Sequence, residues 1–460
     1  MYNTMQRIST LLLIGLIALS AATAGVKPNG LISDNAVLQR GTSVPIWGTA
    51  DQGEKVTVGF QGQTVSTIAR NGQWIVRLKP LKAGGPFTMR INDLEFKNIL
   101  VGEVWICSGQ SNMAFTVAKG DNAESAVAAS KDSMLRLLTV PQNDNGEPAL
   151  AWQECGPDTV GSFSAVGYFF GRDLRKELDV PVGLINSSVG GTPAEAWTSR
   201  AVIRANPDLR YLLRDPVRTG KGRPGGLYDA MIVPLQPYAM RGVIWYQGEA
   251  NASRAQEYRT LFPAMIADWR NAWGQGDFPF LFVQLAPFTP KLPEGAWAEL
   301  RQAQLVTAIT VPNTAMAVIT DLGEENDIHP KKKEPVGERL ALAARALVYG
   351  EQIEYSGPMY TKSVVLGDKV ILCFDHVDGG LVVRGETLAG FAIAGADGNY
   401  VPAKAEIRRD KCVLVSSPQV SEPTAVRYGW SNWMAVNLYN KAGLPASPFC
   451  TCDFPMKMVE

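Results

Sequence analysis

The sequence predicts an α/β fold in which helices cover both faces of a parallel β-sheet, with a β-rich domain on either side of it along the chain. Between about residues 100 and 350, short apolar runs alternate with helical patterns, as they do in parallel sheets. Before this region, from 27 to 100, short runs of β-branched and aromatic residues are separated by turn residues, and similar runs return from 351 to 460. Such runs are typical of small β-domains.

Five apolar runs are the expected strands of the central sheet. Strands of a parallel sheet are buried on both faces, so they form continuous apolar runs rather than alternating ones. The carboxyl ends of these strands meet at one edge of the sheet, where the sites of open α/β proteins form. The five runs are 101–107, 182–186, 242–246, 278–284 and 315–320.

One helical pattern lies between the first two of these strands, and another follows the last strand. In each pattern, apolar residues recur three or four positions apart, and that spacing places them on one face of a helix. Gly350 follows the second pattern and marks its expected end. The apolar positions are Phe163, Val166, Phe170 and Leu174 in the first pattern, and Val336, Leu340, Ala343 and Leu347 in the second.

We expect a β-sandwich before the central sheet and a second β-domain after it. The predicted division of the chain is 25–100, 101–350 and 351–460. The strand-like runs that support it are 44–47, 55–60 and 73–78 in the first part, and 364–366, 369–374 and 411–415 in the last.

The first residues resemble a secretory signal. Arg7 is followed by the short apolar run 11–19 and by the small residues Ala22, Thr23 and Ala24. This pattern predicts a signal peptide over 1–24 and an exported protein, periplasmic or secreted. The alternative is an N-terminal membrane anchor, but the run is short for a bilayer span, so we expect no membrane association after cleavage.

The composition excludes some partners and cofactors. The chain of 460 residues has 44 basic and 44 acidic residues, and such a balance gives no reason to expect nucleic acid or an anionic membrane as a partner. The six cysteines form no C-x-x-C pair and have no nearby histidine, which argues against a zinc site. In an exported chain some of them can pair as disulfides, in an arrangement that the sequence does not fix.

Histidine is scarce, and only His329 and His376 can shuttle protons near neutral pH. His376 lies inside the C-terminal strand pattern and is expected to be a surface or structural residue. His329 follows the last central strand, and Asp327 precedes it by two positions, so both side chains can point the same way in an extended segment. The alternative is a solvated acidic loop in which the histidine occurs by chance. If His329 does have a carboxylate partner, the rivals of Asp327 for that role are Asp321, Glu324 and Glu325.

Ser111 is the candidate nucleophile. It follows the first central strand, and Gly109 permits a tight turn there. A serine at such an edge can be activated by a base and can offer its backbone N–H to an oxyanion. The alternative is an ordinary helix cap, a common role for serine after a strand. Cys107 lies within an apolar run and is expected to be buried, and Ser108 is a weaker rival.

Two further segments follow central strands. Gln247, in the run 245–251, carries an amide that can donate to an oxyanion without titrating. Gly190 and Gly191, in the run 188–193, let a backbone N–H approach a substrate closely, although a glycine pair more often marks a turn.

Four motifs in this order resemble the SGNH/GDSL hydrolases. Within that superfamily they are most similar to the bacterial sialate O-acetylesterase family and its acetylxylan-esterase-like relatives, and the resemblance covers most of the chain after residue 24. GQSNM and WYQGEAN are the specific motifs, and the other two are supportive. The motifs are GQSNM (109–113), VGGTPAEAW (189–197), WYQGEAN (245–251) and DIHP (327–330).

The resemblance implies a flavodoxin-like parallel sheet with flanking β-sandwich-like domains, and it assigns roles to the candidate residues. Other SGNH hydrolases usually carry D-x-x-H where this chain has D-x-H, which puts the strength of the carboxylate contact in question. The implied roles are nucleophile for Ser111, base for His329, acid for Asp327, and oxyanion donors for Gln247 and for Gly190 or Gly191.

The implied activity is removal of O-acetyl groups from a carbohydrate, sialate above all, through an acetyl-serine. This reaction requires neither a metal nor an organic cofactor. One alternative is an acetylxylan esterase of the same fold. Another is a non-catalytic carbohydrate-binding protein that uses some of the 11 tryptophans for stacking, but such a protein has no need of the full Ser, His, Asp and Gln set. A lipase is disfavoured because a G-x-S-x-G elbow is absent around Ser111.

Overall fold

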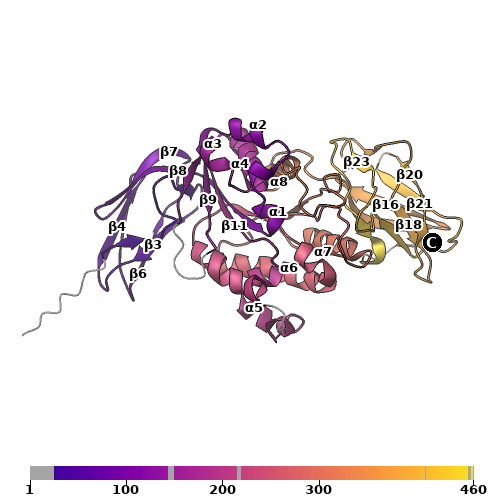
Figure 1. Ribbon diagram of the computed structural model, residues 1–460, viewed down its shortest axis with the longest axis horizontal. Coiled ribbons are helices and arrows are strands. Elements are labelled where there is room, and N and C mark those ends of the chain that lie inside the picture. Colours follow the sequence, from indigo (N-terminus) through magenta and orange to yellow (C-terminus); the bar gives the residue numbers. More distant parts are fainter. Residues whose placement is uncertain (1–24, 143–149, 215–218, 410, 454–456, 459–460) are drawn as a thin grey trace, which may run out of the picture.

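The computed structural model describes residues 25–142, 150–214, 219–409, 411–453 and 457–458. The predicted signal peptide, 1–24, lies outside them. Along the long axis, an N-terminal β region, a central α/β region and a C-terminal β region follow one another (Figure 1). Within these residues, none of the helices combines the length and apolar character that crossing a bilayer requires.

The central sheet has six parallel strands and one antiparallel edge strand. Its order is β10-β9-β11-β8-β12-β13-β14, and β10 is the antiparallel member. The chain leaves β8 for β9 and β11 on one side and then crosses to β12 on the other, so the strand order reverses at β8. The five predicted strands are confirmed, and β9 is an additional one. The bounds are β8 (Leu94–Gly109), β9 (Asp132–Thr139), β10 (Gln153–Cys155), β11 (Val182–Ser188), β12 (Gly242–Tyr246), β13 (Phe280–Val283) and β14 (Thr314–Ala317).

Strand β8 belongs to two parts of the molecule. Its beginning pairs with β7 (Gly84–Ile91) and β2 (Val37–Gln39), whereas its end pairs with β11 and β12. The N-terminal sheet is therefore continuous with the central one through a single strand. The predicted boundary after residue 100 falls inside β8, and the division of the chain into 25–100, 101–350 and 351–460 stays a prediction.

Helices cover both faces of the central sheet, as predicted. In Figure 1, α4 and α8 lie on one side of the sheet, and α6 and α7 lie on the other. On the first face, Trp105 of β8 meets Phe170 edge to face, with ring centroids 5.0 Å apart. On the second, Trp245 of β12 meets Trp269 at 5.9 Å. The bounds are α4 (Ala165–Leu178), α6 (Ala255–Trp273), α7 (Ala296–Thr310) and α8 (Glu334–Leu347).

The flanking regions are β-rich, and the strand-like runs predicted in both of them are confirmed. In the first, β1-β3-β6 form a small sheet, and β4 pairs with β5 and β7. Its bounds are β1 (Lys27–Pro28), β3 (Val44–Thr49), β4 (Lys55–Phe60), β5 (Gln63–Ile68) and β6 (Gln73–Leu78).

The C-terminal region contains three further sheets, ordered β20-β21-β16-β15-β25, β19-β18-β22-β24 and β17-β23. Their bounds are β15 (Met359–Leu366), β16 (Lys369–Asp375), β17 (Leu381–Val383), β18 (Phe391–Ala394), β19 (Val401–Pro402), β20 (Lys404–Arg408), β21 (Cys412–Ser416), β22 (Ala425–Tyr428), β23 (Leu438–Asn440), β24 (Phe449–Cys450) and β25 (Lys457–Met458).

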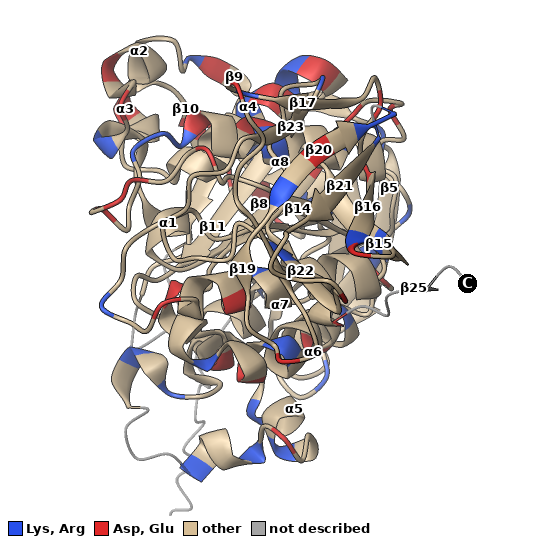
Figure 2. Cartoon of the chain, turned by 90° about the vertical axis from the view of Figure 1, so that its right-hand side faces the viewer, with Lys and Arg blue, Asp and Glu red and all other residues tan. Residues whose placement is uncertain are grey.

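Figure 2 views the molecule from its C-terminal side and shows basic and acidic residues interspersed along the helices and strands. This distribution agrees with the equal totals of basic and acidic residues in the sequence.

Two cysteines, Cys450 and Cys452, form a disulfide. Cys373 and Cys412 face each other across β16 and β21 with their Sγ atoms 3.6 Å apart.

Candidate active site

The turn after β8 carries Ser111, and glycine makes this turn possible. Gly109 has a φ of +134°, and a Cβ at this position would lie 2.2 Å from the backbone oxygen of Tyr246 at the end of β12. The next N–H, that of Gln110, donates to the same oxygen at 3.0 Å. Ser111 then begins the short helix α1 (Ser111–Ala114) and is half-buried. The first N–H groups of a helix have no acceptor within it, so they are free to face a substrate.

The glycine pair after β11 lies beside this serine. The N–H of Val189 donates to the backbone oxygen of Gly109 at 3.1 Å, which joins the two turns. A Cβ at Gly190 would lie 3.5 Å from the Cβ of Ser111. At Gly191 the φ is +73° and a Cβ would meet open space. Gly190 therefore provides the close approach to Ser111, and Gly191 provides the left-handed backbone conformation.

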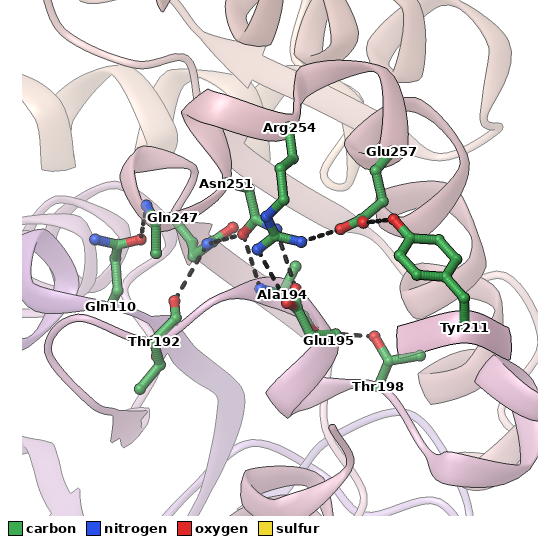
Figure 3. Close-up of polar contacts among 11 residues, drawn as sticks. Gln110, Thr192, Ala194, Glu195, Thr198, Tyr211, Gln247, Asn251, Arg254 and Glu257 are labelled. Carbon is green, nitrogen blue, oxygen red and sulfur yellow. Dashed lines mark hydrogen bonds and ion pairs between the residues drawn. The ribbon is translucent and has the colours of Figure 1, made fainter. Parts of the chain in front are cut away.

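Gln247 follows β12 and is fully buried. Its Nε2 donates to the backbone oxygen of Thr192 at 3.2 Å and to Oδ1 of Asn251 at 2.7 Å (Figure 3). Oδ1 of Asn251 also accepts from the N–H of Ala194 at 2.9 Å, so this atom must be the carbonyl oxygen. The atom of Gln247 that faces it must therefore be the amide nitrogen. Both amide hydrogens of Gln247 are thus engaged, and its Oε1 is buried without a hydrogen-bond partner among the described residues.

A chain of polar contacts extends from Asn251 toward the surface. Nδ2 of Asn251 donates to Glu195 at 3.0 Å, and Arg254 pairs with the same carboxylate at 3.0 Å. Arg254 also contacts Glu257, which in turn accepts a hydrogen bond from Tyr211 (Figure 3). The loop that carries Gln247 is therefore held by charge-assisted hydrogen bonds, which are stronger than neutral ones, and the bond between Asn251 and Glu195 is buried.

Gln110 joins the serine turn to the loop after β12. Its side chain is buried, and Oε1 accepts from the N–H groups of Gly248 at 3.4 Å and Ala250 at 3.2 Å. This residue was not among the predicted site residues. It lies inside the GQSNM motif beside Ser111, so its position in the motif was the available signal.

His329 lies in the segment 318–333 between β14 and α8, as predicted. Oδ1 of Asp327 accepts from the backbone N–H of His329 at 2.8 Å, whereas its distance to Nδ1 of the imidazole is 3.9 Å. Burial and the charge of Lys333 lower the pKa of His329, while Asp327 raises it. The net direction favours a neutral imidazole at neutral pH, the form that can accept a proton.

Three of the rival residues are buried or engaged by other partners. Asp321 forms a two-pronged ion pair with Arg339, at 2.6 and 2.8 Å. Ser108 is buried and donates to the backbone oxygen of Ser187 at 2.5 Å. Cys107 is buried too, and burial raises the pKa of its thiol. None of these three is arranged to act as an acid or nucleophile at an exposed site.

His376 lies away from the sheet edge that carries these motifs. Its Nδ1 is 2.7 Å from Glu354, and its backbone oxygen accepts from Asn440 at 2.9 Å. Its ring also meets Tyr355 edge to face. These contacts agree with a structural role for this histidine.

Known proteins resemble this chain over most of its length. A family model described as carbohydrate esterase, sialic acid-specific acetylesterase matches residues 101–346. Sialate O-acetylesterases of Mus musculus and Homo sapiens are 32% and 33% identical to it. The mouse alignment covers 95% of this chain and 96% of the mouse protein, and the human alignment covers 93% of each.

The chain belongs to the sialic acid-specific acetylesterase family of carbohydrate esterases. A solved structure supports this membership, because a carbohydrate acetylesterase from Xanthomonas citri has a TM-score of 0.86 and 42% identity to this chain, over 92% of it and 99% of the other. The esterase family acts on carboxylic esters, and this protein is a hydrolase of that class. Every candidate site residue named from the sequence lies within the matched range except His376.

The structure brings one further set of side chains to this family's site that was not predicted. Glu249 and Lys333 both contact the side chain of Asn112, the residue next to Ser111. Asn112 and Glu249 lie in the two specific motifs, which was a usable signal. Lys333 lies in a run of three lysines, and nothing in that run distinguishes it. In the part of the esterase that the structure describes, no group of three or more histidine, cysteine or acidic side chains is arranged to hold a metal ion.

Proposed function

We propose that this esterase is a sialate O-acetylesterase that works through an acetyl-serine on Ser111. The observation that carries the proposal is the meeting of three motifs at the carboxyl edge of the sheet. The side chain of Asn112, next to Ser111, donates to the backbone oxygen of Ile328, next to His329, at 3.0 Å. Gly190 approaches Ser111 from the third motif. The named activity of the mouse and human relatives supports sialate as the sugar.

In the proposed mechanism, His329 takes the proton from Ser111 as its oxygen attacks the acetyl carbonyl. The N–H groups of Ser111 and Gly190 hold the oxyanion, together with the amide of Gln247. The sugar oxygen leaves with the proton from the imidazolium. Water then attacks the acetyl-serine with His329 as base, the bond between the acetyl carbon and the Ser111 oxygen breaks, and acetate leaves as the imidazolium returns the proton to Ser111. No metal or organic cofactor takes part in these steps.

Two contacts define what this proposal requires of the side chains. To donate to the oxyanion, Nε2 of Gln247 must give up or share its 3.2 Å hydrogen bond to the backbone oxygen of Thr192. The shorter bond to Asn251 keeps the amide oriented. Asp327 must act mainly by charge, because its oxygen is bonded to the backbone of His329 rather than to the ring. A carboxylate near the imidazole stabilises the imidazolium that forms when Ser111 is deprotonated.

The finer expectations belong to the same proposal. We propose that residues 1–24 are removed, that the protein is exported to the periplasm or secreted, and that its substrate is a free or glycosidically linked acetylated sugar. Neither nucleic acid nor a membrane is a proposed partner. The relation to acetylxylan esterases, drawn from the motifs, makes acetylated xylan the competing substrate.

Acetate release from three substrates tests the proposal. We expect kcat/KM to be highest for an O-acetylated sialic acid, lower for 4-nitrophenyl acetate and lowest for acetylated xylan, with each activity lost in Ser111→Ala. Faster hydrolysis of acetylated xylan would move the assignment to an acetylxylan esterase. Sugar binding without acetate release from any substrate would favour the non-catalytic alternative.

A further inference from the structure

Lys333 is a buried lysine that contacts Asn112, the residue next to Ser111. It precedes α8, and only 1% of its surface is exposed. Its Nζ lies over the rings of Phe115 at 4.9 Å and Tyr246 at 5.4 Å. Lysines are almost never fully buried unless their charge has a partner, because desolvating an ammonium is costly. Its two neighbours in the lysine run, Lys331 and Lys332, are exposed.

The partner of Lys333 is Asn112, whose amide is fully engaged by three separate segments. Oδ1 of Asn112 accepts from Nζ of Lys333 at 2.5 Å. Nδ2 donates to Oε1 of Glu249 at 2.5 Å and to the backbone oxygen of Ile328 at 3.0 Å. Asn112 adjoins Ser111, Glu249 lies two residues after Gln247, and Ile328 adjoins His329. One buried side chain therefore ties together the segments that carry three of the proposed reacting groups.

Glu249 gives this cluster a second ionisable group, which is half-buried with its Oε2 atom fully buried. Its Oε2 has no hydrogen-bond partner in the described part of the chain, and neither does the nearby hydroxyl of Tyr246. Burial raises the pKa of Glu249 above its usual value, although its bond from Asn112 and the charge of Lys333 act in the opposite direction. Lysine, amide and carboxylate thus form a hydrogen-bonded chain in which Asn112 links two opposite charges. Removing one charge of such a buried pair leaves the other uncompensated.

We propose that Lys333, acting through Asn112, is a positioning residue that fixes the His329 loop against the Ser111 turn and places a positive charge beside the imidazole. The inference rests on the proposed function, since it assigns a role toward Ser111 and His329. Lys333 does not touch the substrate in this account. Its first effect is geometric, because displacement of a catalytic group by about 1 Å can cost about a hundredfold in rate.

The second effect concerns protonation of His329. Two positive groups lower the pKa of this imidazole: Lys333, at the start of α8, and Lys119, in the 3-10 turn Val117–Lys119. The negative charge of Asp327 raises it. Burial lowers the pKa of Lys333 itself to about 7, although the charges of Glu249, Asp327 and Glu324 act to raise it. Lys333 is therefore charged in the acidic range in which His329 titrates. A positive neighbour there disfavours the imidazolium and keeps the base neutral to lower pH.

The test compares Lys333→Met with Lys332→Met, which removes the same charge from an exposed position one residue away. For Lys333→Met we expect kcat to fall by about tenfold or more with little change in KM. We also expect the acid limb of kcat/KM to move to higher pH, because the imidazole has lost a positive neighbour. Lys332→Met should match the parent in both respects. A folded Lys333→Met variant with the parental kcat and pH profile would overturn the inference.

A second variant covers the case in which Lys333→Met does not fold. The double variant Lys333→Met with Glu249→Gln removes both charges, so no buried charge is left unpaired, and the amide oxygen introduced at position 249 can still accept from Asn112. We expect the double variant to fold and to show the same shifted acid limb, and an unshifted limb would overturn the inference. Activity that survives in Ser111→Ala or His329→Ala would instead defeat the proposed function. Loss in those two variants with parental behaviour in the lysine variants would defeat only the inference.

Discussion

Asp327 is bonded to the backbone of His329 rather than to its ring. Its Oδ1 accepts from the backbone N–H at 2.8 Å and lies 3.9 Å from Nδ1 of the imidazole, which is too far for a hydrogen bond. The carboxylate therefore holds the shape of the loop directly and acts on the imidazole through its charge. This arrangement separates two roles that a direct carboxylate–imidazole contact would combine.

The first prediction separates these roles by mutation. Asp327→Asn keeps an oxygen that can accept the backbone bond but loses the charge, so we expect kcat to fall by about tenfold or more. Asp327→Ala loses both and should be less active still. The matched control is Glu325→Gln, an exposed residue of the same loop, which should keep the parental kcat. If Asp327→Asn were as active as the parent, the enzyme would work as a Ser–His pair.

The second prediction concerns the pH dependence of kcat/KM. The imidazole must be neutral to accept the serine proton, so activity should rise with pH through one limb. Because burial and Lys333 lower the pKa of His329 from its usual value of 6.5, the midpoint of that limb should lie below 6.5. His376→Ala should leave the limb unchanged. A limb that disappears in His376→Ala would show that the wrong histidine has been chosen.

The third prediction distinguishes the two glycines. An added methyl at Gly190 would lie 3.5 Å from the Cβ of Ser111, so Gly190→Ala should fold normally but lower kcat/KM by crowding the acetyl group. At Gly191 the φ of +73° is unfavourable for alanine, and Gly191→Ala should lower the free energy of unfolding by about 1 kcal/mol. Thermal melts with steady-state kinetics would check both, and the opposite pattern would assign the close approach to Gly191.

The fourth prediction concerns Gln247. Gln247→Ala should lower kcat by about a hundredfold with a smaller change in KM, since an oxyanion donor contributes mainly to the transition state. Gln302 offers a matched control, because it is also buried and its amide anchors strand β24 through the backbone oxygen of Cys450. Gln302→Ala should lower Tm and spare kcat. A change confined to KM would make Gln247 a substrate-binding residue instead.

The sequence predicted the parts of this fold that depend on local pattern. The apolar face formed by Phe163, Val166, Phe170 and Leu174 is buried, and all but the first lie in α4. The strand predicted over 101–107 is also present, but β8 begins earlier, at Leu94. Its first half is extended because it pairs with β7, and the polar residues there gave no sign of that pairing.

Candidate site residues could be picked from the sequence where a motif carries them, but not where distant segments meet. Ser111 and His329 could be chosen from their places after strands. The contact between Asn112 and Lys333 joins residues 221 positions apart, and no periodicity encodes such a pairing. The spacing of Asp327 and His329 correctly indicated neighbours, but it could not show that the carboxylate accepts its hydrogen bond from the backbone N–H of His329 rather than from the ring.

The most direct test of the account is to trap the acetyl group on the enzyme. The parent protein is mixed with 4-nitrophenyl acetate, quenched with acid within one turnover, digested and analysed by mass spectrometry. We expect the acetyl group on Ser111, with loss of activity by about a thousandfold or more in a folded Ser111→Ala variant. An acetyl group on another residue, or substantial activity in Ser111→Ala, would contradict the claim that Ser111 is the nucleophile of this esterase.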